Sequence, residues 1–324
     1  MPAKISIVIP TYNSFEYMKP LLDSLEAQKD KDFEIIIADD CSTDGTYLRL
    51  LEYSAKTSLI MRVYQNEKNS GPGISRNYGF SKAIGEYVTF VDSDDTVTDD
   101  FISSLREIID REAPDCVIFD YTLVKGDKSK TVSSYSGAEE GISDKKHALV
   151  RSGSSIWAKM FKKSVITDNS VTFPALFRHE DFCFVKKTIS HCEKVFYLKK
   201  PLYKYIVRQG SVMSNDDLEK VMTAKVAFED IEKEIGETYP DETEAFFLLL
   251  VVYSATLGMA YIKSPRKEIK KYLEEIEPLY PNRKNNIYLK DFPMHTRRVI
   301  NACEKKRIGV IKFYAWLKRR TGGR

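Results

Sequence analysis

Three carboxylates stand within the four residues Asp92-Ser93-Asp94-Asp95, directly after the apolar run 87–91. Like charges this close repel one another, so such a cluster is costly unless a cation lies among the carboxylates. An all-oxygen site beside a diphosphate is the usual setting for Mg²⁺ or Mn²⁺. An acidic helix cap is the alternative, but residues 98–100 already provide one. The pattern therefore predicts a metal site with Asp94, Asp92 and Asp95 as ligands.

A second pair of carboxylates, Asp39-Asp40, follows the apolar run 33–38. A carboxylate at a strand end can accept hydrogen bonds from a nucleotide base or from ribose hydroxyls, and Asp40 is the candidate for that contact. Residues 42–44 are better explained as the cap of the next helix. After the first apolar run, Tyr12 could stack on a flat base, although an aromatic ring at this place is more often packing.

A glycine-containing loop lies between these two acidic segments. It includes Gly71-Pro72-Gly73, and Arg76 follows one turn into the expected helix. Helix N-termini bind anions, so Arg76 is a candidate partner for a diphosphate or for the carboxylates of residues 92–95. Alone this signal is weak, because many loops contain Gly-Pro-Gly.

The elements that must position these side chains can be predicted from hydrophobic periodicity. Short runs rich in Ile, Val, Phe and Tyr have strand length and alternate with segments of helical period. The predicted strands are 5–10, 33–39, 59–65, 87–92 and 116–123, and the predicted helices are 15–27, capped by Asn13, 46–56, 74–83 and 101–111. This alternation predicts an α/β fold with a mainly parallel sheet and helices on both faces. Its ligands bind beyond the carboxyl ends of the strands.

The chain is predicted to be helical after residue 214. Helical periodicity covers 218–235, 242–262, 266–276 and 299–317, with prolines between these segments. We therefore place a domain boundary between an α/β domain, 1–214, and a helical domain, 215–324. The apolar stretch 246–262 reaches the lower length limit of a membrane span but contains polar residues, so a buried helix is favoured.

Composition and charge exclude several classes of protein. Hydrophobic residues make up 43% and charged residues 30% of the chain, which is typical of a globular protein with a real core. Five cysteines without a CxxC pair argue against a structural zinc site and a disulfide framework, and favour a reducing cytosol. The start lacks the features of a signal peptide. The net charge is only +3 and the basic residues gather in the tail, so we expect no nucleic-acid partner.

The tail combines apolar and basic residues in one helical pattern. Apolar side chains within 310–317 are interleaved with Lys312 and followed by Lys318, Arg319 and Arg320. Such a helix can lie on an anionic leaflet. The alternatives are packing onto the helical domain or a contact in a homo-oligomer. We expect a cytoplasmic protein that contacts the inner face of the membrane, or a second copy, through this region.

Four segments, in this order, resemble the successive signatures of the inverting family 2 glycosyltransferases. They are Ser6–Asn13, Asp39–Thr46, Asn69–Asn77 and Asp92–Asp95. Residues 157–163 and 205–214 are also similar to bacterial members that build capsule, teichoic acid or other surface glycans. The resemblance covers roughly the first two thirds of the chain and implies a GT-A fold, a nucleotide-sugar donor and Mn²⁺ or Mg²⁺ held by the Asp-x-Asp element. Cys41 departs from the family, which often has a small glycine there.

The resemblance also implies roles for single residues. Thr11 and Tyr12 would line the base pocket, Asp40 would meet the base, and Asp92 and Asp94 would serve ribose and metal. Arg208 and Ser211 would help to close over the diphosphate. The candidate nucleotide-sugar-binding residues are Pro10, Thr11, Tyr12, Asn13, Asp40, Asn69, Arg76, Asp92, Ser93, Arg208 and Ser211.

The segment Arg178-His179-Glu180-Asp181-Phe182 resembles the Glu-Asp element from which the family takes its catalytic base. Asp181 is the candidate base and Glu180 the next one. Without the upstream motifs, such a pair would most often be a solvated helix N-terminus. For the acceptor, Trp157 could stack on a sugar or belong to the core, and His179 could touch the acceptor or face solvent.

The predicted activity is metal-dependent transfer of a sugar, with inversion, from a UDP-sugar to a hydroxyl of a saccharide, lipid-linked or polymer acceptor. A sugar-1-phosphate nucleotidyltransferase would need a Gly-rich phosphate loop and a Lys where Thr11-Tyr12-Asn13 stands. A dehydrogenase would need GxGxxG there, and no nucleophile elbow indicates a hydrolase. A catalytically silent glycan- or nucleotide-binding module is the rival from another class, and the presence of Asp92, Asp94 and Asp181 argues against it.

Overall fold

The computed structural model describes residues 4–208 and 217–320. The chain divides into two compact units. The first comprises Met1–Ala175 with Glu180–Ser211, and the second comprises Leu176–His179 with Val212–Arg324. The predicted boundary between residues 214 and 215 lies outside the described residues.

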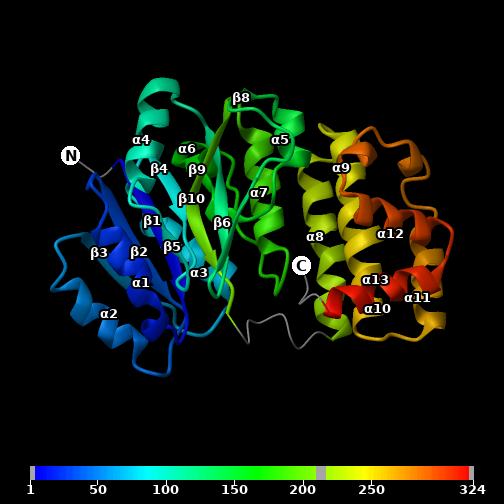
Figure 1. Cartoon of the computed structure of the whole chain (residues 1–324), viewed down its shortest axis with the longest axis horizontal. Coiled ribbons are helices and arrows are strands. Elements are labelled where there is room, and N and C mark those ends of the chain that lie inside the picture. The colour runs from blue at the N-terminus through cyan, green and yellow to red at the C-terminus, as the bar shows by residue number, and fades with distance from the viewer. Residues whose placement is uncertain (1–3, 209–216, 321–324) are drawn as a thin grey trace. The chain divides into compact units, whose positions relative to one another are not determined.

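The first unit is built on one sheet (Figure 1). The strands are β1 (Ile5–Thr11), β2 (Phe33–Asp39), β3 (Ile60–Gln65), β4 (Tyr87–Phe90), β5 (Thr96–Val97), β6 (Cys116–Lys125), β7 (Lys128–Val132), β8 (Gly141–Ser143), β9 (Lys159–Lys162) and β10 (Val195–Ile206). Their order is β3-β2-β1-β4-β9-β6-β10-β5, with β7 beside β6 and β8 beside β10. Strands β1 to β4 pair in parallel, as do β6 and β10, whereas β5, β7, β8 and β9 pair antiparallel with their neighbours. The sheet is therefore mixed and mainly parallel, as predicted.

Helices cover both faces of this sheet. They are α1 (Phe15–Glu26), α2 (Thr46–Ser54), α3 (Pro72–Lys82), α4 (Phe101–Glu112), α5 (Lys145–Arg151), the 3₁₀ turn η1 (Ile156–Ala158), α6 (Lys163–Asp168) and α7 (Glu180–His191). Every residue of β1 and β2 is buried. Since successive side chains of a strand point to opposite faces, both faces must be covered.

Helix α3 lies unusually close to β1 and β2. A Cβ atom on Gly79 would come within 2.6 Å of Val8 and 3.3 Å of Ala38. Glycine at position 79 therefore permits the close approach, which fixes the place of Arg76 one turn earlier in the same helix. At the start of α1, the predicted cap Asn13 instead has a φ of 48°, and Ser14 is the residue at the N-cap.

The second unit is helical. Its elements are α8 (Leu218–Ile235), α9 (Pro240–Phe247), the π-helical turn η3 (Leu248–Ala255), α10 (Thr256–Tyr261), α11 (Arg266–Ile276), the 3₁₀ turns η4 (Arg283–Asn285) and η5 (Leu289–Asp291), α12 (Met294–Glu304) and α13 (Ile308–Arg320). The segment Pro240–Tyr261 is long and apolar enough to cross a membrane, but 72% of its most apolar window is buried in the structure. This burial agrees with the predicted core helix.

The predicted single helix over 299–317 is wrong, because the chain turns between α12 and α13. Lys306 has a φ of 49°, its N–H donates to the Cys303 carbonyl, and the Arg307 N–H donates to the Ala302 carbonyl. These two bonds form a Schellman motif, which ends a helix. The motif usually has glycine at the left-handed position, so a lysine there gave no sequence signal for the break.

Candidate active site

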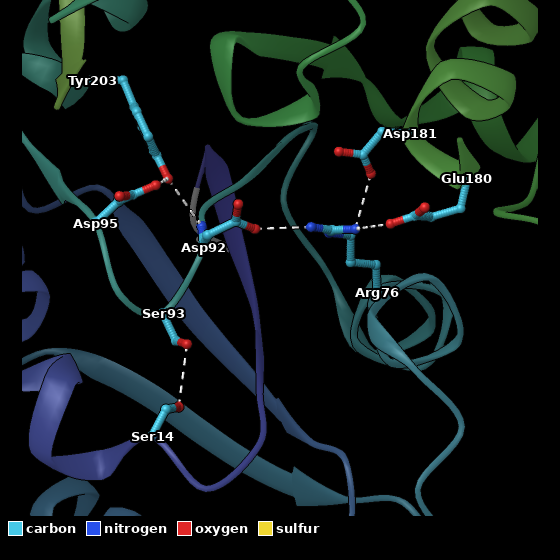
Figure 2. A network of polar contacts seen from close by, with 8 residues as sticks. All are labelled: Ser14, Arg76, Asp92, Ser93, Asp95, Glu180, Asp181 and Tyr203. Atoms are coloured by element: carbon cyan, nitrogen blue, oxygen red, sulfur yellow. Dashed lines mark hydrogen bonds and ion pairs between the residues drawn. The ribbon is translucent and has the colours of Figure 1, made fainter. Parts of the chain in front are cut away.

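Arg76 joins three carboxylates from two distant parts of the chain (Figure 2). Its Nη2 lies 2.8 Å from Asp92 Oδ1, and its Nη1 lies 2.9 Å from Asp181 Oδ1 and 3.4 Å from Glu180 Oε1. The Arg76 side chain is only 5% exposed. Its ion pair with Asp92 is the contact between Arg76 and the acidic segment that the sequence predicted. Residues 76, 92 and 180–181 thus form one site at the carboxyl end of β4, as the predicted sheet requires.

The loop before α3 is anchored by Asp40. The Ser70 and Gly71 N–H groups donate to the Asp40 carboxylate at 2.9 and 2.7 Å, and Asn66 Nδ2 donates to it at 2.8 Å. Asp40 is 4% exposed. The structure therefore assigns Asp40 a role in holding the start of α3, while its predicted contact with a nucleotide base stays a prediction.

Helices α3 and α7 meet closely where their polar side chains converge. A Cβ atom on Gly73 would lie 3.2 Å from Glu180 Cγ and 3.3 Å from Phe173 Cβ. Asn77 holds the same region through two hydrogen bonds of 2.9 Å. Its Nδ2 donates to the Phe173 carbonyl, and its Oδ1 accepts the Phe173 N–H. A small residue at position 73 thus lets the first turn of α7 reach Arg76.

The two acids of α7 have altered proton affinities. Burial raises the pKa of both Glu180 and Asp181 above the usual carboxyl range, although the positive charge of Arg76 opposes the change. A buried carboxylate with a raised pKa is a stronger base than a surface one, which suits a group that accepts a proton from a hydroxyl.

The three acids after β4 point in different directions. Asp92 faces Arg76, whereas Asp95 is 1% exposed and accepts hydrogen bonds from the Tyr203 hydroxyl at 2.6 Å and the Ile206 N–H at 2.7 Å. Burial and the charge of Asp92 raise the pKa of Asp95 to about 8. Asp95 is therefore turned into the protein and held by β10, and its predicted role as a metal ligand stays a prediction. Nowhere in residues 4–208 and 217–320 do three or more His, Cys, Asp or Glu side chains form a ready metal cluster.

Asp94 is the acid that faces outward from this segment. Its side chain is 48% exposed, and Arg208 Nε lies 3.9 Å from Asp94 Oδ2. The Arg208 guanidinium also donates to the Asp94 carbonyl at 2.6 Å and lies 4.5 Å from the centre of the Tyr17 ring. Arg208 therefore lies beside the predicted metal and diphosphate site. Ser211, its predicted companion, falls outside the described residues.

The residues after β1 divide into buried and exposed ones. Pro10 and Thr11 are buried, and Thr11 shares a hydrogen bond with Ser14, which in turn contacts Ser93 at 3.2 Å (Figure 2). Tyr12 is 46% exposed, so its ring is available for stacking. Two other candidates complete this edge of the sheet. Asn13 binds the loop after β2 through Ser42 and Thr43, and Asn69 is exposed.

The two acceptor candidates, Trp157 and His179, are both removed from full contact with solvent. Trp157 is 8% exposed, stacks on Tyr203 and Tyr205, and meets Tyr121 edge-on, which favours the core interpretation, while its stacking on a sugar stays a prediction. His179 has a φ of 68° immediately before α7. Burial lowers its pKa to about 4, so its imidazole is neutral at pH 7.

Sequence reasoning missed Tyr203, which is fully buried under the acidic segment. Its hydroxyl donates to Asp95 and accepts the Asp92 N–H at 3.2 Å. The tyrosine lies in β10, more than a hundred residues along the chain from these acids, and the strand pattern around it carries no sign of the contact.

Comparison with known proteins places this geometry in a family. Residues 6–189 match the family model for glycosyl transferase family 2. The chain belongs to this family. TarS, the poly(ribitol-phosphate) β-N-acetylglucosaminyltransferase of Staphylococcus aureus, is 31% identical to this family 2 member over 255 residues, covering 76% of this chain and 44% of TarS. The chain thus spans less than half the length of that relative.

Solved structures agree with this membership. The crystal structure of S. aureus TarS 1–349 in complex with UDP-GlcNAc matches with a TM-score of 0.75 at 25% identity, over 98% of this chain and 92% of the other. The mannosyltransferase PcManGT of Pyrobaculum calidifontis, solved with GDP-Man and Mn²⁺, shares the fold, with a TM-score of 0.51 at 14% identity over 94% and 86% of the two chains. The predicted family and the predicted GT-A fold followed by helices are confirmed.

Proposed function

We propose that this chain moves a sugar from a UDP-sugar to an acceptor hydroxyl, with inversion at the anomeric carbon. The observation that carries the proposal is the Arg76 cluster, which brings the acid pair of α7 to the strand end that bears Asp92. N-acetylglucosamine is the proposed sugar, because TarS was solved with UDP-GlcNAc. The proposed acceptor is a saccharide, a lipid-linked intermediate or a polymer of the cell envelope, in line with the poly(ribitol-phosphate) in the name of TarS.

A divalent cation fits Asp94 and Asp92, the two acids of this segment that are not buried. Burial, and then the charge of Asp92, raise the pKa of Asp94, while the charge of Arg208 opposes the change, so a nearby cation would favour the ionised form of Asp94. One or two carboxylates together with substrate phosphates are what Mg²⁺ commonly takes in such sites. Asp94 and Asp92 would hold Mn²⁺ or Mg²⁺, which would neutralise charge on the departing diphosphate.

The proposed reaction is a single in-line displacement. Asp181 accepts the proton of the acceptor hydroxyl as that oxygen attacks the anomeric carbon. The bond from that carbon to the diphosphate breaks, its electron pair leaves with UDP, and the configuration inverts. Arg76 keeps Asp181 in place by an ion pair at 2.9 Å, and Tyr12 offers an exposed ring for the uracil.

UDP is expected to bind at least about tenfold more tightly with Mn²⁺ or Mg²⁺ than with chelator, which is about 1.4 kcal/mol. Asp94→Asn should remove most of this difference because it takes a charge from the cation site. Isothermal titration calorimetry with UDP measures both effects. Asp99→Asn is the control, because it removes an exposed carboxylate that follows the acidic segment Asp92–Asp95. This variant should bind UDP with the affinity of the parent. Equal affinity with and without metal would refute the metal site, and tighter binding of GDP or ADP would refute the uracil assignment.

We also propose that α13 contacts an anionic membrane surface where lipid-linked acceptors reside. Its exposed side chains include Phe313 at 55% and Trp316 at 42%, and the Arg320 guanidinium lies 4.4 Å from the centre of the Trp316 ring. An aromatic and basic face of this kind suits the boundary between headgroups and acyl chains. Contact with a second copy is the alternative occupant.

The double variant Phe313→Ser, Trp316→Ser is expected to lose most of its flotation with vesicles that contain anionic lipid. Ile287→Ser is the matched control, because Ile287 is equally exposed at 57% in the same unit. Flotation of the double variant at the level of the parent would contradict the membrane proposal, and a parent that does not float but forms dimers would favour the second copy.

A further inference from the structure

The helical unit contains a pocket that the proposed transfer reaction does not use. Its volume is about 350 Å³, which is in the range of pockets that bind small molecules. All the residues that line it lie between positions 248 and 305, so the pocket belongs to the second unit alone. The Arg76 cluster lies in the first unit. Any ligand of this pocket is therefore recognised separately from the nucleotide sugar.

One part of the pocket wall is apolar. It is formed by three aliphatic side chains, Leu248 of η3, Leu289 of η5 and Ile300 of α12, which we call the apolar wall. Leu248 and Ile300 also belong to the buried core of the unit. A ligand that covers these side chains with an apolar chain gains from the removal of both surfaces from water.

The acid that lines the pocket is already neutralised. Arg283 Nε donates to Glu304 Oε1 at 2.7 Å, and Arg283 Nη2 donates to Glu304 Oε2 at 3.3 Å. The two side chains are only 6% and 10% exposed. Such a forked pair has fixed geometry, so Glu304 contributes no net negative charge for a ligand to overcome.

Three further cations line the same pocket and are exposed. They are Lys284 of η4, Arg297 of α12 and Lys305, which we call the cationic rim. Lys284 Nζ lies 3.3 Å from the Glu304 carboxylate that Arg283 holds. Within residues 4–208 and 217–320, Arg297 and Lys305 have no ion-pair partner. The rim therefore offers a net positive charge directly beside the apolar wall.

We propose that this pocket binds a lipid phosphate, with its apolar chain against the apolar wall and its phosphate at the cationic rim. A phosphate monoester carries about −1.5 to −2 charges at pH 7, which matches a rim of three cations better than the single charge of a carboxylate does. Arginine and lysine are also the usual phosphate-binding side chains. The inference goes beyond the proposed function and does not rest on it.

Isothermal titration calorimetry with octyl phosphate, below the concentration at which it forms micelles, tests the ligand class. Inorganic phosphate carries the head without the chain, and octanol carries the chain without the charge. We expect the parent to bind octyl phosphate at least about tenfold more tightly than either. Inorganic phosphate bound equally well would leave only an anion site, and octanol bound equally well would remove the role of the cationic rim. Either result, or no binding of octyl phosphate, would overturn the proposal.

A charge-matched pair of double variants tests the place of binding. Arg297→Gln with Lys305→Gln removes two rim charges and should weaken octyl phosphate binding about tenfold or more. Arg298→Gln with Lys290→Gln is the control, because it removes the same charge from exposed side chains that do not line the pocket. All four side chains are exposed, so both double variants should fold. Equal affinity of the two would overturn the site.

Two other outcomes would assign the pocket or the ligand differently. A parent that binds no octyl phosphate but sediments as a dimer, while the rim variant sediments as a monomer, would show that the pocket holds a second copy. Phe313→Ser with Trp316→Ser should still bind octyl phosphate, because neither residue lines the pocket. Loss of binding in this variant would place the ligand at α13 instead. An inactive parent would contradict the proposed function and leave these binding measurements intact.

Discussion

Asp181→Asn is expected to lower the turnover number by about 10²–10⁴, the usual contribution of a general base, and to leave UDP affinity unchanged. Asparagine keeps the size of the side chain but cannot accept the proton of the acceptor hydroxyl. The variant should spare UDP binding, because Asp181 pairs with Arg76, whereas Asp92 and Asp94 are the proposed groups for metal and nucleotide. Parallel measurement of UDP release and of UDP binding by calorimetry checks both halves of the expectation.

The pH profile of the parent gives a second check on Asp181. A base acts only when deprotonated, and burial raises the pKa of this carboxyl above its usual range. The kcat of the parent should therefore fall as the pH decreases through that raised value, and should form a plateau above it. If Asp181→Asn turns over like the parent, the base lies elsewhere, and Glu180→Gln becomes the variant that must abolish turnover.

Arg76→Met is expected to lower the free energy of unfolding by about 3 kcal/mol, near the lower end of the range for breaking a buried ion pair. The guanidinium is 5% exposed, and its removal leaves Asp92, Glu180 and Asp181 without their shared cation. The lower end applies because these acids are 13% to 29% exposed, so water offsets part of the loss. Urea unfolding measures the change.

The control for Arg76 is an arginine whose ion pair is exposed. Arg49→Met breaks a pair with Glu16 in which the side chains are 46% and 73% exposed, and such pairs contribute about 0–1 kcal/mol. Turnover should fall in Arg76→Met and persist in Arg49→Met, since only Arg76 touches the candidate base. Equal stability of the two variants would show that the buried cluster contributes nothing to the fold.

The sequence predicted the sheet well because its strands are buried on both faces and lie between helices of clear period. Asp92 and Arg76 follow from this, since residues after parallel strands share one edge, and their contact was expected. Asp181 came instead from resemblance, because no local pattern shows that a helix start 105 residues beyond Arg76 returns to it.

The directions of single side chains could not be predicted from the sequence. Asp94 and Asp95 are neighbours in the sequence, and no local pattern distinguishes them. Asp95 turns inward because the Tyr203 hydroxyl and the Ile206 N–H, both from β10, donate hydrogen bonds to it. For Trp157 the sequence left two interpretations, stacking on a sugar and packing in the core. Neighbouring strands supply the tyrosine rings that pack against it. Such choices depend on pairings between distant strands, which periodicity does not encode.

The most direct test of the account is the anomeric configuration of the product formed from UDP-N-acetylglucosamine with Mn²⁺, followed by ¹H NMR as UDP is released. Water can replace the acceptor if none has been found. Because the donor is the α-anomer, a single displacement predicts that the sugar first appears as the β-anomer, and that Asp181→Asn slows its appearance. Release of the α-anomer as the first product, or no release of UDP by the parent with any nucleotide sugar, would contradict an inverting glycosyltransferase.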